Sequence, residues 1–150
     1  MDEITPTSRA GWLGLLARAP QGRLAELCAA TAVDAPFNWL RRPETGTVMV
    51  RGRVGGTGQP FNLGEITVTR AALQLATGET GHGHVQGRDK EAARLTALLD
   101  ALMQTSRAEA IRSAILAPLA AELQARTTDR AEKAAATRVE FFTLVRGEDQ

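Results

Sequence analysis

The stretch TVMVRGRV (residues 47–54), followed by GGTGQP (residues 55–60), decides the fold of this chain. Its valines alternate with polar residues, so we expect a strand with one buried face and an opposite face that carries Arg51 and Arg53. The glycine-rich loop is too short for a crossover connection, and the strand after it must therefore pair antiparallel. The sequence predicts a β-hairpin with a glycine-rich tip.

Alternating patterns continue on both sides of this hairpin. Residues 37–42 predict a short strand before it, and PETG (residues 43–46) predicts the turn that joins the two. After the hairpin loop, the apolar residues of 61–76 change phase twice, which we attribute to bulges near Gly64 and Arg70. A further turn leads to a weakly apolar strand. We therefore expect a four-stranded antiparallel meander.

Helical patterns precede the strands. Thr7 or Ser8 can cap a first helix that Pro20 ends, and a second helix follows before the break at residues 34–36. Cys28, the only cysteine of the chain, lies within the second pattern, and we expect it to act as a small buried apolar residue. A single cysteine excludes an intrachain disulfide and a thiolate metal site built from this chain alone.

Helical patterns also follow the strands. Asp89 is the expected N-cap of a helix with a broad apolar stripe, made by Leu95, Leu98, Leu99, Leu102 and Met103. Ser106 and Glu109 have the spacing of a capping box for a further helix, in which Pro118 should produce a kink or an interruption.

The C-terminal part of the chain predicts surfaces that other elements must cover. Residues 122–138 have little to bury and predict an extended helical arm. The apolar segment that follows needs a covering layer, from this chain or from a partner. The interface candidates are Phe141, Phe142 and Arg146.

The composition is that of one globular domain. Of 150 residues, 43% are hydrophobic and 23% charged, which fits a single domain over residues 1–150. The expected fold class is α+β, a four-stranded antiparallel meander sheet with two N-terminal helices and two or more C-terminal helices. No apolar run reaches the roughly 20 residues that span a bilayer, and the first residues lack the basic start of a signal peptide. We expect a cytoplasmic protein without a membrane partner.

Positive charge is concentrated in the middle of the chain. The net charge is only +1, which does not predict a nucleic-acid partner. Residues 37–90 nevertheless carry seven basic side chains against four acidic ones. Arginine side chains and consecutive glycine amides both suit phosphate or carboxylate groups. We expect one functional surface, centred on the stretch from Arg51 to Lys90. Its candidates for substrate or partner binding are Arg51, Arg53, Gly55, Gly56, Thr57, Gly58, Arg70, Gln86, Gly87, Arg88, Asp89 and Lys90.

The glycine loop also has a purely structural interpretation. A Walker loop needs a Gly-Lys-Ser/Thr sequence and a following helix, and a dinucleotide loop needs a strand before it and a helix after it. This loop meets neither requirement. A flexible hairpin tip therefore explains the glycines as well, and an anion or an acidic partner near Arg51 and Arg53 is the alternative.

His82 and His84 would share one face of a strand, a spacing that is compatible with two metal ligands. No other histidine occurs in the chain, and no carboxylate pattern nearby supplies a third ligand. We expect a surface or interface feature and no metal site, and an independent metal hydrolase is the alternative.

Seven motifs, taken together, resemble those of one known family. They are ETG (44–46), GGTG (55–58), TVTRA (67–71), VQGRDK (85–90), DALMQ (100–104), PL (118–119) and RVEFFTLVRG (138–147). Their order and spacing are similar, through nearly the whole chain, to the PhnG subunit family of bacterial carbon-phosphorus lyase. Residues before Ser8 and the arm at 122–137 match poorly.

The resemblance implies a role in the use of phosphonates as a phosphorus source. Members of the family act with PhnH, PhnI and PhnL subunits to join methylphosphonate to C1′ of the ribose of ATP, with release of adenine. A separate radical subunit, PhnJ, later cleaves the carbon-phosphorus bond. The resemblance also implies a core complex with two copies each of PhnG, PhnH, PhnI and PhnJ.

The resemblance assigns no catalytic residue to this subunit. We therefore expect a non-catalytic or site-sharing subunit, with ATP as substrate of the complex and no cofactor bound by this chain alone. The alternative is a stand-alone nucleotide- or phosphonate-binding module that uses the glycine loop with Arg51 and Arg53.

Overall fold

The computed structural model describes residues 6–137. Two helices, α1 (Arg9–Leu16) and α2 (Arg23–Ala30), precede the strands β1 (Phe37–Arg53), β2 (Pro60–Leu75) and β3 (Thr80–Gln86). The helices α3 (Lys90–Leu102), α4 (Ala108–Ile111) and α5 (Ala117–Ala136) follow, and a π-helical segment, Arg112–Leu116, joins the last two. None of the helices in residues 6–137 is long and apolar enough to cross a membrane.

The sheet in this part of the chain has three strands in the order β1-β2-β3, all antiparallel, so the prediction of a four-stranded meander was wrong. The expected strand, turn and second strand run as one strand, β1, whose register against β2 shifts near Arg41 and near Glu44. β1 lies at the edge of the sheet, where a proline such as Pro43 is tolerated and bulges absorb the extra residues. The α+β class is confirmed.

β3 packs against α3 through its glycines. A Cβ atom added at Gly81 or Gly83 would lie 1.9 or 2.0 Å from a backbone oxygen of α3. These distances are far below van der Waals contact, so only glycine lets the strand and the helix approach this closely. His82 and His84 alternate with these glycines and therefore lie on the opposite, exposed face of β3.

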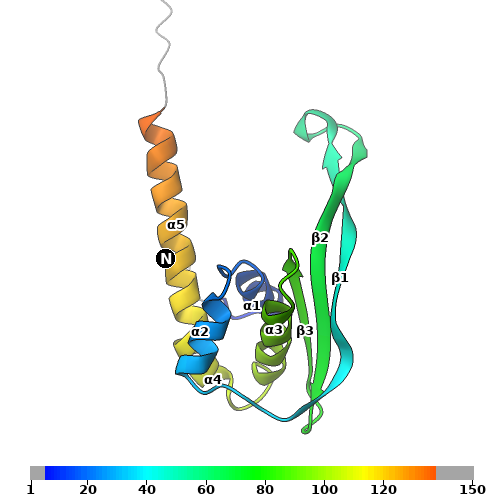
Figure 1. Cartoon of the computed structure of the whole chain (residues 1–150). Coiled ribbons are helices and arrows are strands. Elements are labelled where there is room, and N and C mark those ends of the chain that lie inside the picture. Colours follow the sequence, from blue (N-terminus) through cyan, green and yellow to red (C-terminus); the bar gives the residue numbers. More distant parts are fainter. Residues whose placement is uncertain (1–5, 138–150) are drawn as a thin grey trace, which may run out of the picture.

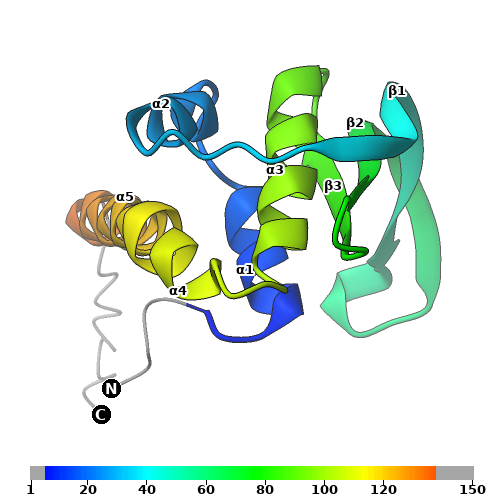
Figure 2. The same ribbon diagram turned by 90° about the horizontal axis from the view of Figure 1, so that it is seen from below.

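The helices lie together on one side of the sheet, with α3 directly against the strands and α1, α2 and α4 beyond it (Figure 2). The apolar stripe predicted for α3 is buried in this layer, which confirms that prediction. Leu73 of β2 and Ile115 of the π-helical segment join the same core. Pro118 is the second residue of α5, just after that segment, where a residue without an N–H donor is tolerated.

Two of the three predicted helix starts are confirmed. The side chains of Ser8 and Asp89 each accept a hydrogen bond from the third residue of α1 and α3, at 3.2 and 2.8 Å. The capping box at Ser106 was wrong, because α4 begins only after Arg107, whose N–H donates to a threonine hydroxyl (3.1 Å).

The first two strands continue beyond β3 as a free hairpin. β3 pairs only with Val68–Gln74 of β2, whereas the pairing of β1 with β2 continues to Arg53 opposite Pro60. We call residues 47–67 the hairpin arm, and its presence confirms the predicted hairpin. The arm rises from one side of the molecule and α5 from the other, in the same direction (Figure 1).

Candidate functional site

The glycine loop forms the closed tip of the hairpin arm. Gly58 donates its N–H to Val54 O (2.8 Å), and Arg53 Nη1 donates to Gly58 O (3.1 Å). Gly55 and Gly56 have positive φ angles of 59° and 84°, which favour glycine over other residues. The geometry of the loop itself therefore accounts for its glycines.

Arg51 and Arg53 lie on one face of the arm, opposite Asn62 and Pro60 of β2. This confirms that the arginines and the valines alternate between two faces. The valine face was expected to be buried, but Val48 and Val50 are only partly buried, because among residues 6–137 no helix covers this face (Figure 2). Val54, the residue after β1, is 63% exposed.

A second group of candidates lies at the junction between β3 and α3. Gly87 turns the chain there with a φ angle of 92°, and its carbonyl oxygen accepts a hydrogen bond from Thr69 Oγ1 (2.7 Å). Asp89 then caps α3. Arg88 and Lys90 are exposed, and neither has an ion-pair partner within residues 6–137. Two cationic side chains without a partner in this part of the chain therefore flank the start of α3.

This junction borders a cavity of about 560 Å³. Residues from 16–25, in the end of α1, the following connection and the start of α2, form one side, and residues from 85–95 form the other. The lining combines the apolar Leu24 and Leu95 with the charged Arg88 and Lys90. A cavity of this size and mixed character suits a small polar ligand or side chains of a partner protein.

The sequence-predicted residues do not form the single surface that we expected between Arg51 and Lys90. The two arm arginines and the loop Gly55–Gly58 lie at the end of the hairpin arm, beyond the last residue of β3. The segment 87–90 lies at the cavity. The structure thus divides the candidates, because the long β1–β2 pairing carries the loop away from the β3–α3 junction.

Arg70 and Gln86 lie in a third place, on the sheet face that points away from the helices. Arg70 forms an ion pair with Glu44 (3.3 Å), which also pairs with Arg41. His84 lies directly opposite Arg70 on β3. In the part of the chain that the structure describes, no three His, Cys, Asp or Glu side chains gather as metal ligands.

Comparison with known proteins identifies the family. The model of the family "phosphonate metabolism protein PhnG" matches residues 7–147. The chain belongs to the PhnG family. A relative from Rhizobium meliloti (strain 1021), the alpha-D-ribose 1-methylphosphonate 5-triphosphate synthase subunit PhnG, is 50% identical over 148 residues, which are 99% of this chain and 95% of that protein.

The PhnG-family match includes each surface described above. It covers the hairpin arm, the β3–α3 junction and the sheet face that bears Arg70. It also extends over the interface candidates Phe141, Phe142 and Arg146, which lie outside the described residues.

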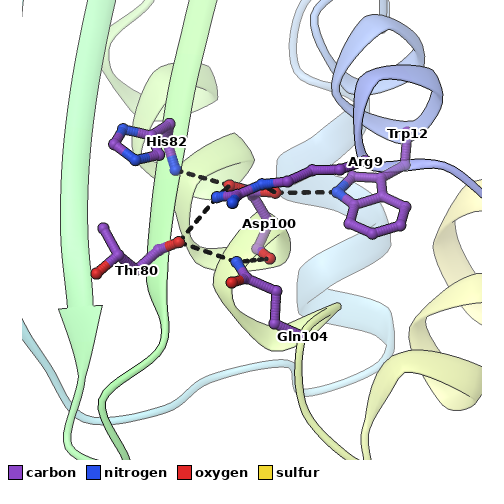
Figure 3. Close-up of polar contacts among 6 residues, drawn as sticks. All are labelled: Arg9, Trp12, Thr80, His82, Asp100 and Gln104. Carbon is purple, nitrogen blue, oxygen red and sulfur yellow. Dashed lines mark hydrogen bonds and ion pairs between the residues drawn. The ribbon is translucent and has the colours of Figure 1, made fainter.

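One central residue of this PhnG-family chain was missed by the sequence analysis. Asp100 of α3 is completely buried, and its carboxylate accepts two bonds from Arg9 (3.1 and 2.7 Å) and one each from Trp12 Nε1 (3.0 Å) and the His82 N–H (2.9 Å) (Figure 3). These bonds raise the pKa of Arg9 above its usual value. The only signal for this residue was an acidic side chain within the apolar second half of the helix.

The contacts of Asp100 indicate a structural role. They join α1, α3 and β3, and Gln104 adds a bond from its side-chain amide to Thr80 O (2.9 Å) (Figure 3). Every oxygen of the carboxylate is already engaged by donors of this chain. Asp100 therefore fixes the position of β3 and is not placed to bind a substrate.

Cys28 is buried in α2, as predicted. Burial raises the pKa of its thiol. A buried thiol that stays protonated is a poor nucleophile, so the structure supports its role as a packing residue.

Proposed function

We propose that this chain is the PhnG-type subunit of a ribose 1-methylphosphonate 5-triphosphate synthase, which transfers methylphosphonate to C1′ of the ribose of ATP and releases adenine. The observation that carries the proposal is 50% identity over 99% of the chain to a relative that is named as a subunit of that synthase. The proposed partners are PhnH-, PhnI- and PhnJ-like subunits, two copies of each, in a cytoplasmic complex. A PhnL-like ATPase acts alongside them.

The distribution of polar groups favours a non-catalytic or site-sharing role. The one fully buried carboxylate of the described residues, Asp100, is saturated by four donors. Most of the remaining candidates are arginine and lysine side chains or glycine amides, which bind anions but do not by themselves supply an acid and a base. Asp89, the one carboxylate among them, caps α3 by accepting a hydrogen bond from the Ala92 N–H. We therefore assign the chemistry of the transfer to an active site that partner subunits complete, with ATP bound as a substrate of the complex.

The proposal is tested by expressing the subunits with and without this chain. We expect the chain to co-purify with a tagged PhnI-like subunit, and the complete set to release adenine from ATP in the presence of methylphosphonate. Adenine is measured by chromatography. A chain that stays monomeric and never co-purifies, or full adenine release from a set without it, would contradict the proposal.

Within this complex, Arg88 and Lys90 are the side chains that we propose to contact the triphosphate or a partner carboxylate. Both lie at the rim of the cavity and lack an ion-pair partner in residues 6–137. Arg88→Ala in the assembled complex should raise the KM for ATP several-fold, since a charge-assisted hydrogen bond contributes roughly 1.5–3 kcal/mol. Arg130→Ala, on the exposed part of α5, is the matched control, and an equal effect of the two variants would remove the assignment.

The second candidate function is a nucleotide- or phosphonate-binding module that acts alone. The cavity beside Arg88 and Lys90 favours it over a pure scaffold. Calorimetry of the isolated chain with ATP and with methylphosphonate decides between them. Heat of binding that Arg51→Ala abolishes would support the glycine loop with Arg51 and Arg53, and heat that only Arg88→Ala abolishes would support the cavity. Absence of heat with both ligands favours the subunit role.

A further inference from the structure

The apolar side of β2 changes from one sheet face to the other along the strand. Toward its end, β2 contributes Ala71, Leu73 and Leu75 to the buried core cluster on the side of α3. On the hairpin arm, Ile66 has the other parity and lies on the face away from α3. Near Arg70 the register shift adds a residue to β1 and not to β2, so the phase change of β2 there is a change of the face that needs covering. The bulge predicted near Gly64 is confirmed, because Leu63 is an extra residue of β2 between the pairs Val50–Gly64 and Arg51–Asn62.

The arm has a continuous apolar strip on this outer face. Val48 lies opposite Ile66, Val50 opposite Gly64, and Phe61 opposite Gly52. The Phe61 ring lies 3.3 Å from the position of a Cβ atom at Gly52, so it packs on the backbone of β1. Phe61 and Ile66 are still 42% and 36% exposed.

Nothing in residues 6–137 covers this strip. All helices lie on the other side of the sheet (Figure 2), and β3 ends before the arm begins. A two-stranded ribbon is marginally stable in water unless its apolar face packs against another layer. The valines and Ile66 lie on one face, which indicates that the layer covering them does not come from residues 6–137.

The charge of the outer face indicates what kind of surface can cover it. The same outer face carries two guanidinium groups, Arg41 and Arg70, against one carboxylate, Glu44, which leaves it with a positive excess. A surface of this sign is complemented by carboxylates at the edge of the partner surface. A symmetric second copy of this chain would instead bring a surface of the same sign against it.

We propose that the outer face of the hairpin arm docks on another subunit of the synthase, against an apolar surface that is flanked by carboxylates. This proposal rests on the proposed function, since it needs a partner subunit. It assigns the valines, Ile66 and Phe61 to the centre of the interface, and Arg41 and Arg70 to its edge. The face that carries Arg51 and Arg53 stays free for a different contact.

The test compares the same substitution on the two faces of the arm. Val48→Asp places a charge on the outer face, and Thr47→Asp places it one residue earlier on the opposite face. Each variant is titrated against the tagged PhnI-like subunit co-purified with its PhnH- and PhnJ-like partners. We expect Val48→Asp to raise the Kd at least about tenfold, whereas Thr47→Asp stays within about twofold, because a charge buried at the centre of an interface is far more costly than one at an exposed position.

A second variant tests whether weaker binding results from loss of the apolar strip or from misfolding of the arm. Val48→Thr combined with Ile66→Thr keeps β-branched side chains on both strands, so the hairpin is retained while the apolar strip is lost. Circular dichroism and the Tm of the isolated chain check that each variant is folded. The double variant should also weaken binding about tenfold.

The outcomes separate this inference from the proposed function. If the wild-type chain fails to bind the partner subunits, the proposed function fails. If the wild type binds but Val48→Asp and Thr47→Asp bind alike, the outer face is not the docking surface. A wild-type homodimer that Val48→Asp dissociates would show that a second copy occupies the face, and would also overturn the inference.

Discussion

β3 and the part of β2 in the hairpin arm both contain glycine, but the space around their glycines differs. A Cβ atom at Gly83 of β3 would lie 2.0 Å from the Ala93 carbonyl oxygen, whereas at Gly64 of the arm it would meet no atom within 4 Å. The first strand is packed to atomic contact by its own chain. The second has open space on its apolar side, so residues 6–137 fill the space beside one region and leave it open beside the other.

The largest expected effect comes from adding a methyl group to the close contact between β3 and α3. Gly83→Ala should lower the free energy of unfolding by about 3 kcal/mol or more, because the methyl group has to displace helix backbone rather than a flexible side chain. Gly64→Ala, the control in the arm, should change it by less than about 1 kcal/mol. Urea unfolding of both variants measures the difference, and similar losses would show that the two regions are equally packed.

The next effect in size concerns the buried carboxylate. Asp100→Ala leaves Trp12 Nε1 and the His82 N–H without an acceptor, so we expect a loss of about 2–3 kcal/mol in the free energy of unfolding. Glu44→Ala, which removes exposed ion pairs on the outer sheet face, should cost less than about 1 kcal/mol. Denaturant midpoints at constant m-value provide the comparison. If Glu44→Ala lowered the free energy of unfolding more than Asp100→Ala, the outer sheet face would contribute more to stability than the buried carboxylate, contrary to our expectation.

A smaller effect is expected on the apolar strip itself. Ile66→Ala should destabilise the isolated chain by only about 1 kcal/mol, since the side chain is already 36% exposed. Leu98→Ala, at a fully buried position of α3, should cost about 2–5 kcal/mol. Thermal unfolding of the two variants, in the presence and absence of the partner subunits, sharpens the comparison: the cost of Ile66→Ala should grow only when the partner is bound.

The smallest effect is a pH dependence in the packed region. The hydrogen bond from Arg94 lowers the pKa of Glu91, so the ion pair stabilises the folded chain above the unfolded pKa of about 4.3 and this contribution is lost as the pH falls through the folded pKa. Because the pair is partly exposed, the contribution is about 0.5 kcal/mol. Glu91→Gln should therefore lower stability at pH 7 and leave it almost unchanged at pH 3. An equal loss at both pH values would assign the effect to the helix start rather than to charge.

Local chemistry was predictable from the sequence where a single side chain decides the structure. The caps at Ser8 and Asp89 and the apolar stripe of α3 follow from short-range rules, and they were found. The expected turn at residues 43–46 failed, because Pro43 and Gly46 are as compatible with a bulged edge strand as with a turn. Only the pairing with β2 decides between these two, and that pairing is a long-range property.

The candidate site was predicted less well for the same reason. The glycine loop and the segment 86–90 were expected on one surface, but the length of the arm separates them. In GHGHV (residues 81–85), the histidines were considered as metal ligands, whereas the alternating glycines determine how closely β3 packs against α3. Asp100 could not be found without knowing that Arg9, some ninety positions earlier, lies beside it.

The open edges of the arm have a consequence for the cell that makes this chain. Among residues 6–137, β2 has no neighbour beyond β1 between residues 60 and 67, and β1 has none on its outer side along the arm, so both rows of backbone donors and acceptors are available to another strand. A copy synthesised without its partners is thus exposed to edge-to-edge aggregation and to proteolysis. Matched production of the subunits would limit these losses, and overexpression of this chain alone should give a larger insoluble fraction than co-expression with its partners.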